Sequence, residues 1–193
     1  MNILMVAAPG AGKGTQASRL AERYGVEHLA SGDLLRHELA LGSAIGRAAA
    51  SYVERGDLVP DELVMRLVLD RAVTAAGRGG YVLDGFPRTR QQAEEAYAMT
   101  GQQEHLTLDA VVHLEVAHDE LRRRMLARAS AGDRIDDRHA VIDHRLDVYD
   151  RQTQPLLEYY RDRGLLVCVD GERPVDEVTQ LLFDALDGVR SGG

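Results

Sequence analysis

The chain has 193 residues, of which 45% are hydrophobic and 28% charged, a balance typical of a single soluble globular domain. Its net charge of −8 argues against a nucleic acid or an anionic membrane as the main partner. The single cysteine, Cys168, excludes a disulfide framework or a cysteine-based zinc site within one chain, so we expect no structural zinc. The N-terminal apolar run is too short for a signal peptide and no stretch approaches the length of a membrane span, which makes the cytoplasm the expected location.

Apolar runs and helical patterns alternate along the chain. Candidate strands lie at 2–7, 27–30, 81–83, 110–115 and 165–169. Candidate helices lie at 13–24, 31–41, 44–55, 61–76, 89–100, 118–129, 138–162 and 174–189. Strands that are apolar throughout and separated by helices predict an α/β domain, a doubly wound parallel sheet of about five strands flanked by helices.

Two segments interrupt this alternation. Residues 31–59 are helical with no strand between the helices, and residues 130–137 are polar with almost no apolar anchor. Segments with little apolar content cost little to move. We therefore expect both to lie over the edge of the sheet.

The turn after the first strand is the most informative motif. The run Pro9-Gly10-Ala11-Gly12-Lys13-Gly14-Thr15 follows an apolar strand and opens onto a helix. Successive backbone N–H groups and a helix start bind anions, and Lys13 adds a full positive charge, so the run predicts a phosphate-binding loop. It departs from the general pattern at Ala7, where Gly is usual, and at Gly14, which separates the lysine from Thr15. A turn without a ligand is the alternative, which the strand, lysine and helix start together disfavour.

Asp84 opens the second motif, Asp84-Gly85-Phe86-Pro87-Arg88, directly after the third strand. Ligands of open α/β sheets bind at the carboxyl ends of strands. A carboxylate there can hold the hydration shell of Mg²⁺. The alternative is a turn aspartate that satisfies local N–H groups.

Ser31, Arg36 and Gln92 each have a plain structural interpretation. Ser31 could cap the helix after it, Arg36 could be a solvated charge, and Gln92 forms a capping box with Thr89. The functional alternatives are a hydroxyl near a base or sugar, a guanidinium on a phosphate and an amide at a nucleobase edge. For Gln92, the local sequence favours the cap.

Arginines gather in the C-terminal half of the chain. Arg124 and Arg128 share a helix face, Arg134 falls in the polar segment, and Arg145 lies in the next helix. Arginine pairs with phosphate through a bidentate fork, and a solvated helix face is the alternative. The seven histidines show no zinc-ligand spacing.

Together, these ordered motifs resemble the adenylate kinase family of nucleoside monophosphate kinases over nearly the whole chain. The resemblance implies Mg²⁺-dependent transfer of the γ-phosphoryl group of ATP to AMP, which gives two ADP. It implies one P-loop domain over residues 1–193, with an AMP-binding flap at 30–59 and a short lid at 129–139 that has no cysteine zinc site. A monomer is the natural expectation.

The resemblance also implies roles for individual residues. On the ATP side these are Gly10, Ala11, Gly12, Lys13, Gly14, Thr15, Arg124, Arg128 and Arg173. On the AMP side they are Ser31, Arg36, Asp57, Leu58, Val59, Gly85, Phe86, Pro87, Arg88, Gln92, Arg134 and Arg145. The implied catalytic set is Lys13, Asp84, Arg88, Arg128, Arg134 and Arg145, with Asp84 orienting hydrated Mg²⁺. An anionic phosphate acceptor needs no general base, so the absence of a catalytic His or Ser is consistent with this chemistry.

Three departures from the family pattern leave alternatives open. Ala7 and Arg173 stand where glycines are usual, and Ser31 stands where Thr is more usual. We predict that Ala7 is tolerated because it has a negative φ or room beside the loop. A UMP/CMP kinase is the nearest alternative, which Ser31 and Gln92 disfavour. A nucleotide-binding regulatory protein without turnover, and a structural α/β module, are the others.

Overall fold

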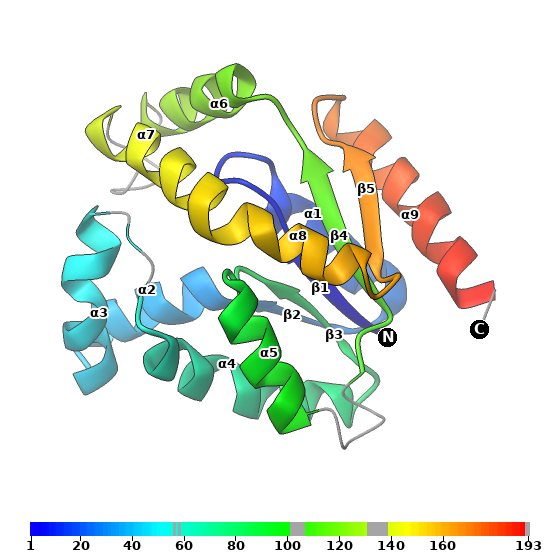
Figure 1. Cartoon of the computed structure of the whole chain (residues 1–193), viewed down its shortest axis with the longest axis horizontal. Helices are drawn as coiled ribbons and strands as arrows, with labels where there is room; N and C mark the ends of the chain where they lie inside the picture. The colour runs from blue at the N-terminus through cyan, green and yellow to red at the C-terminus, as the bar shows by residue number, and fades with distance from the viewer. Residues whose placement is uncertain (56, 58, 101–106, 131–138, 192–193) are drawn as a thin grey trace.

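A five-stranded parallel sheet forms the centre of the computed structural model, which describes residues 1–55, 57, 59–100, 107–130 and 139–191 (Figure 1). The strands are β1 (Asn2–Val6), β2 (Glu27–Ala30), β3 (Tyr81–Asp84), β4 (Ala110–Glu115) and β5 (Leu166–Asp170). Their order is β2-β3-β1-β4-β5, and each neighbouring pair is parallel. The chain builds one side of the sheet through β2 and β3 and the other through β4 and β5. The carboxyl end of β1 is therefore the switch point at which ligands bind in such sheets.

Helices cover both faces of this sheet. They are α1 (Lys13–Tyr24), α2 (Ser31–Leu41), α3 (Ala44–Arg55), α4 (Asp61–Ala76), α5 (Arg90–Thr100), α6 (His118–Ser130), α7 (His139–Val148), α8 (Gln154–Arg161) and α9 (Val175–Ser191). Figure 1 shows α8 lying across one face and α2 with α3 standing to one side of the sheet. None of the described helices is both long and apolar enough to cross a membrane.

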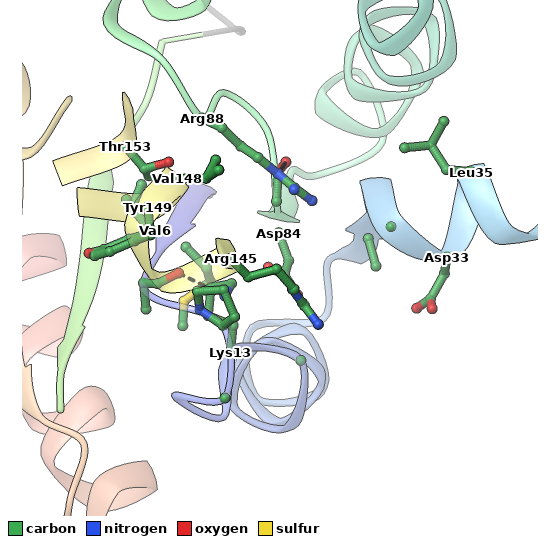
Figure 2. Close-up of a pocket in the computed structure, with 18 of the residues that line it drawn as sticks. Val6, Lys13, Asp33, Leu35, Asp84, Arg88, Arg145, Val148, Tyr149 and Thr153 are labelled. Atoms are coloured by element: carbon green, nitrogen blue, oxygen red, sulfur yellow. Dashed lines mark hydrogen bonds between the residues drawn. The ribbon is translucent and has the colours of Figure 1, made fainter. Parts of the chain in front are cut away.

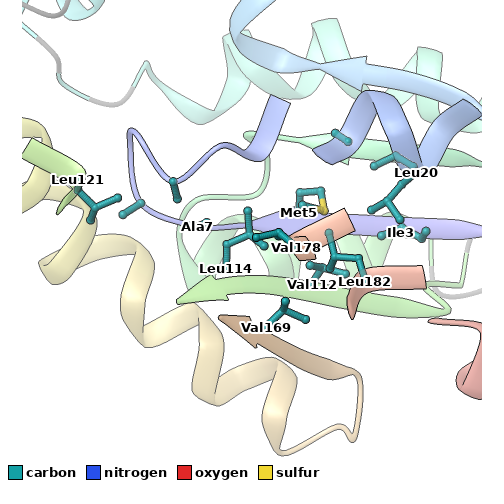
Figure 3. Close-up of a cluster of buried hydrophobic side chains, with 14 of the residues drawn as sticks. Ile3, Met5, Ala7, Leu20, Val112, Leu114, Leu121, Val169, Val178 and Leu182 are labelled. Carbon is teal, nitrogen blue, oxygen red and sulfur yellow. The ribbon is translucent and has the colours of Figure 1, made fainter. Parts of the chain in front are cut away.

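Alternate residues of the central strands β1, β3 and β4 serve two separate cores. Ile3 and Met5 of β1 face α1 and α9, where they join Leu114, Leu20 and Leu182 in one buried cluster (Figure 3). This cluster also takes in residues of α6 and α7. Full burial of each such side chain contributes about 1.5–3 kcal/mol relative to exposure.

The second core lies on the other face of the sheet. Leu4 and Val6 of β1 join Leu83, Val111 and Phe86 in a cluster completed by residues of α2, α3, α4, α5 and α8. Because the side-chain period of a strand is two, a fully apolar strand supplies both cores at once. This explains why the central strands could be predicted from largely apolar runs.

The prediction of one continuous helix over 138–162 is wrong. α7 ends at Val148, a π-helical turn follows over Tyr149–Thr153, and α8 begins at Gln154. The Gln154 N–H donates to the Tyr149 carbonyl, five residues back, and Pro155 has no N–H to donate at the start of α8. The wider turn buries Tyr149 and Thr153 beside the cavity described below.

Candidate functional site

Two glycines shape the turn between β1 and α1. Gly10 and Gly12 have φ angles of 87° and 92°, a region that costs other residues about 1–2 kcal/mol. A Cβ at Gly10 would also lie 3.0 Å from the Leu121 carbonyl oxygen. Gly12 is the N-cap of α1 and accepts a hydrogen bond from the Gln16 N–H at 3.1 Å. The N-terminus of α1 therefore opens onto the glycine turn, which makes an anion site.

Lys13 lies at the start of α1 and is held against the same turn. Its Nζ donates to the carbonyl oxygens of Ala7 at 2.8 Å and Ala8 at 3.1 Å. Among the described residues only glycines have a positive φ. Ala7 therefore has a negative φ, as predicted. Its methyl group is buried in the core beneath the turn, so the alanine does not distort the backbone.

A cavity of about 400 Å³ opens beside this turn, at the carboxyl ends of β1 and β3 (Figure 2). The predicted residues that line it are Gly10, Gly12, Lys13, Gly14, Thr15, Arg36, Asp57, Val59, Asp84, Gly85, Pro87, Arg88, Arg128 and Arg145. Lys13 and the four arginines come from five different segments of the chain, α1, α2, the loop after β3, α6 and α7. The fold thus collects cations that are scattered in an acidic sequence.

Three of the arginines reach the cavity from different elements, the loop after β3, α7 and α2. Figure 2 shows Arg88 and Arg145 extending past Asp84 toward the space in front of α2, which carries Leu35. Arg88 is fixed by its Nε, which donates to the Gly85 carbonyl at 2.7 Å. Arg36 pairs with Asp33 one helical turn earlier.

Asp84 ends β3 and lies next to the phosphate-binding turn. Its Oδ2 is 3.8 Å from where a Cβ on Gly14 would be. Within the described residues, no hydrogen bond or ion pair engages the Asp84 carboxylate. The structure thus gives no support to a turn aspartate that satisfies local N–H groups, and the role of Asp84 at Mg²⁺ stays a prediction. A carboxylate beside a phosphate-binding turn is a donor set suited to hydrated Mg²⁺.

Ser31 and Gly85 meet in a small second pocket next to the cavity. This pocket is also lined by Phe86 and Gln92, and it shares Leu35, Val59, Gly85 and Arg88 with the larger cavity. Gly85 has a φ of 85°, and a Cβ there would lie 2.5 Å from Ser31 Oγ.

Ser31 does not cap α2. Ala30 is the N-cap and makes no side-chain cap bond. Ser31 Oγ is buried and has no hydrogen-bond partner among the described residues. A buried hydroxyl without a partner costs about 1–3 kcal/mol, so this pocket wall is suited to a polar ligand.

Gln92 makes the predicted capping interaction with Thr89. Thr89 Oγ1 accepts from the Gln92 N–H at 3.1 Å, and Gln92 Oε1 accepts from the Arg88 N–H at 2.6 Å. The reciprocal bond reaches one residue further back than in the usual box. The cap fixes the amide of Gln92 in the wall of the second pocket, so the structural and functional interpretations are compatible.

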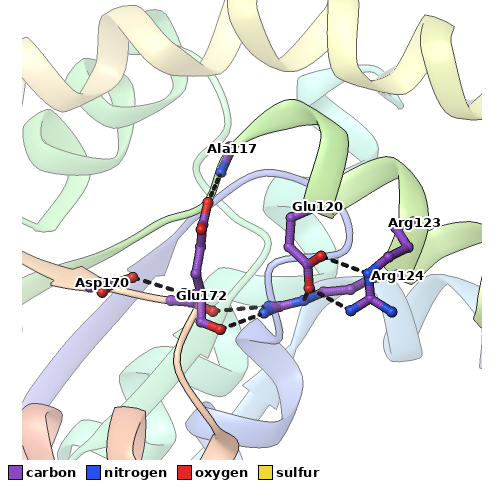
Figure 4. Close-up of polar contacts among 7 residues, drawn as sticks. Ala117, Glu120, Arg123, Arg124, Asp170 and Glu172 are labelled. Atoms are coloured by element: carbon purple, nitrogen blue, oxygen red, sulfur yellow. Dashed lines mark hydrogen bonds and ion pairs between the residues drawn. The ribbon is translucent and has the colours of Figure 1, made fainter.

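Arg173 lies in the loop between β5 and α9, Arg124 lies beside it, and neither lines the cavity. Arg124 donates to the carbonyl oxygens of Gly171 at 2.9 Å and Glu172 at 3.3 Å, and to Glu120 at 2.6 Å (Figure 4). Arg173 pairs instead with Asp170 and Glu177. Hydrogen bonds from Arg123 and Arg124 lower the pKa of Glu120 to about 2, so this anchor stays ionised.

The remaining predicted site residues are partly described by the structure. Ala11 is buried in the loop and Arg128 in α6 reaches the cavity. Leu58, Arg134 and most of the predicted lid at 129–139 lie outside the described residues. The predicted flap at 30–59 includes the described helices α2 and α3.

Sequence reasoning gave no site role to Tyr149 and Thr153, which line the cavity from the π-helical turn. It also missed the apolar lining residues Leu35, Val53 and Val148. Pro155 was the available signal, because a proline near the middle of a long helical pattern marks a break where side chains change direction.

A polar contact joins Asp57, which follows the end of α3, to His144 of α7. Asp57 Oδ1 lies 2.7 Å from His144 Nε2, and Asp57 Oδ2 accepts from Arg55 Nε at 2.8 Å. The His144 hydrogen bond is the largest cause of a lowered Asp57 pKa, followed by that of Arg55. Asp57 is therefore ionised at neutral pH and links two walls of the cavity.

Known proteins resemble this chain along most of its length. The family model for adenylate kinase matches residues 5–165. An adenylate kinase of Micrococcus luteus is 42% identical over 98% of this chain and 92% of its own length. Those of Synechococcus sp. and Methylorubrum populi are 46% and 45% identical, over 95% and 98% of this chain and 97% and 98% of their own lengths. The loop, the cavity and this likeness agree, and the chain belongs to the adenylate kinase family.

Proposed function

We propose that this chain is an ATP:AMP phosphotransferase, which reversibly transfers the γ-phosphoryl group of Mg²⁺-bound ATP to AMP and yields two ADP. The observation that carries the proposal is one cavity in which a phosphate-binding turn, Lys13 and four arginines converge. Two polyphosphate chains concentrate negative charge, and fixed cations from several segments can neutralise it.

The ATP phosphates would lie on the glycine turn. Gly10 to Thr15 supply backbone N–H groups and the N-terminus of α1, and Lys13 supplies an ammonium that can exchange its two loop carbonyls for phosphate oxygens. Arg128 would contact the same phosphates from α6. Arg124 and Arg173 would act on the adenine side through the loop after β5, which Arg124 holds by two carbonyls.

AMP would occupy the other half of the cavity. Arg36 and Arg88 would bind its phosphate, and Ser31, Gly85 and Gln92 would surround its base in the second pocket. The backbone at 57–59 and the residues Phe86 and Pro87 would complete the walls. The buried Ser31 hydroxyl supports a polar ligand here.

Transfer would depend on positioning rather than on proton abstraction. The acceptor is a phosphate oxygen that is already anionic, so it can attack the γ-phosphorus in line once it is held close. Arg88, Arg145 and Arg134 would neutralise the charge spread over the transferring group. The half-buried Asp84 carboxylate would hold Mg²⁺ through water. When bound, Mg²⁺ neutralises charge on the β- and γ-phosphates.

Water is the competing acceptor, so the site must close. We propose that residues 30–59 act as the AMP-binding flap and residues 129–139 as a short lid, which together exclude water. We also propose a monomer in the cytoplasm, supported by a cavity built from one chain and by a sequence with one cysteine.

The test is an assay of ADP formation from ATP and Mg²⁺ with AMP, UMP, CMP and GMP offered separately. Turnover with AMP alone supports the proposal. A better rate with UMP or CMP would make the chain a UMP/CMP kinase. ATP binding without turnover would favour the regulatory alternative.

Two arginines provide a matched pair of variants for this assay. Arg88→Ala should lower kcat by roughly 10²–10³-fold, because it removes charge stabilisation at the transferring group. Arg90→Ala removes an exposed arginine that pairs with Glu94 outside the cavity, so it should retain activity. Equal losses in both variants would refute the role assigned to Arg88.

A further inference from the structure

Three chemically diverse side chains meet on the sheet outside the nucleotide cavity. His113 and Glu115 are two residues apart on β4, so they share a face, and Cys168 lies opposite His113 in the register of β5. Their ligand atoms lie within 4.8 Å of one another, and His113 Nδ1 is 4.0 Å from Glu115 Oε1. The proposed chemistry uses none of the three.

A fourth residue orients the imidazole. His113 Nε2 lies 3.0 Å from the hydroxyl of Tyr149, which leaves Nδ1 as the nitrogen that faces Glu115. In the tautomer that donates from Nε2 to Tyr149, Nδ1 presents a lone pair. A metal-bound histidine in proteins is held in this way, with its other nitrogen bonded to a fixed partner.

The three side chains differ in their exposure to solvent in a way that suits a metal site. The His113 side chain is only 13% exposed, so its imidazole is held in place by the surrounding protein. The Glu115 side chain is 61% exposed and Cys168 is also exposed, so an ion can reach the cluster from solvent.

We propose that His113, Glu115 and Cys168 bind one thiophilic divalent cation such as Zn²⁺. Imidazole, carboxylate and thiolate are all Zn²⁺ ligands, and three protein ligands leave a fourth position for water. Arg161 of α8 lies close enough to influence both His113 and Cys168, and its positive charge opposes the ion. The site is distinct from the Mg²⁺ site expected at Asp84, whose ligands are oxygens.

Cobalt provides a direct test, because Cys168 is the only cysteine in the chain. One equivalent of Co²⁺ added to the chelator-treated chain should produce a thiolate-to-cobalt charge-transfer band, which no other residue can supply. Zn²⁺ should abolish the band by displacement, since it binds such sites more tightly. Absence of the band would overturn the proposal.

Variants test the other ligands. His113→Gln keeps a donor for Tyr149 but should weaken Co²⁺ affinity at least about tenfold, and Cys168→Ala should abolish the band. His118→Gln alters an exposed histidine that pairs with Asp150 and should change nothing. Arg161→Gln should strengthen binding, because it removes the opposing charge. Unchanged affinity in His113→Gln would refute the site.

A measurement on the unmodified chain avoids any dependence on the folding of variants. Stoichiometric Zn²⁺ should slow alkylation of Cys168 by iodoacetamide at least about tenfold, whereas Mg²⁺ at the same concentration should have no effect. Equal alkylation rates with and without Zn²⁺ would overturn the proposal. Neither readout depends on phosphotransferase activity, so the two proposals can fail separately.

Discussion

Lys13 is the only lysine in a chain that carries 23 basic residues, so the other 22 (23 − 1) are arginines. Its ammonium donates to two loop carbonyls at 2.8 and 3.1 Å. An ammonium is a compact point charge with three donors, whereas a guanidinium is a planar fork that needs more room. The tight turn therefore favours lysine at a position where the rest of the chain uses arginine.

This single lysine allows a labelling prediction. An amine-directed acylating reagent should modify two groups, Lys13 and the α-amino group of Met1. Met1 lies at the opposite end of β1 from the loop and donates to the Gly79 carbonyl. ATP at about ten times its Kd should slow labelling of Lys13 about tenfold by occupancy and leave Met1 unchanged. Mass spectrometry measures both, and equal protection of the two amines would contradict the ATP site.

Gly85 gives a second prediction at the scale of one residue. Gly85→Ala should lower the free energy of unfolding by about 1–3 kcal/mol, because it combines a positive φ with a Cβ 2.5 Å from Ser31 Oγ. It should also raise the KM for AMP more than that for ATP. Denaturant unfolding and steady-state kinetics measure these effects.

The same substitution in α9 serves as the control. Gly188 is helical, and a Cβ there would meet nothing within 4 Å. Gly188→Ala should therefore stabilise the chain by up to about 1 kcal/mol through helix propensity. A loss of stability in both variants would show that the close contact at Gly85 is not the cause.

At the scale of elements, the sequence predicted every strand to within about a residue at each end. The central strands are mostly apolar because helices cover both faces of the sheet, and such runs are visible without knowledge of the fold. The break between α7 and α8 was missed, because the helical pattern continues through it and only the five-residue hydrogen bond to Tyr149 defines the π-helical turn.

The exclusion of a cysteine-based zinc site considered only sites with several cysteines, so it overlooked the cluster of His113, Glu115 and Cys168, in which one cysteine joins a histidine and a carboxylate. Motif searches look for metal ligands at fixed spacings along the chain. Cys168 lies on a strand that is distant in sequence and reaches His113 only through the register of β4 with β5. Strand pairing brings these side chains together, and no local pattern encodes that pairing.

The contact between Asp57 and His144 predicts a pH-dependent difference in stability. Because the Asp57 pKa is lowered in the folded chain, its contribution is present above the unfolded value and is lost as the pH falls through the folded value. Asp57→Asn should lower the Tm by about 1–3 °C at pH 7. The difference from the unmodified chain should disappear well below pH ~4.

Thermal scans across this pH range check the prediction. Asp147→Asn is a matched control, because Asp147 is exposed and, among the described residues, pairs only with Arg151 in the π-helical turn that directly follows α7, so it joins no distant parts of the chain. It should show little effect at any pH. A Tm difference for Asp57→Asn that is constant with pH would contradict the electrostatic explanation.

For the whole molecule, the proposal of two facing nucleotide sites predicts how ligands stabilise the chain. A linked bis-adenosine polyphosphate should fill both sites at once and bind far more tightly than ATP. At about 1,000 times its Kd it adds about 4 kcal/mol to the free energy of unfolding, which raises the Tm by about 8–16 °C.

ATP alone at the same concentration should give a smaller rise in Tm, and Lys13→Ala should lose most of the bisubstrate effect. Calorimetry measures these shifts. Equal stabilisation by ATP and the linked compound would mean that only one nucleotide site exists, which would leave the phosphate-binding loop intact but remove the phosphotransferase proposal.

The sequence by itself determined the parallel α/β sheet and the phosphate-binding loop, because both follow from local patterns of apolar residues, glycines and one lysine. Only the tertiary structure decided which of the arginines line a common cavity. Arg36, Arg88, Arg128 and Arg145 line it, whereas Arg124 holds the loop after β5 and Arg173 lies in that loop. A side chain's charge is encoded in the sequence, but its direction depends on the packing of its helix against the sheet.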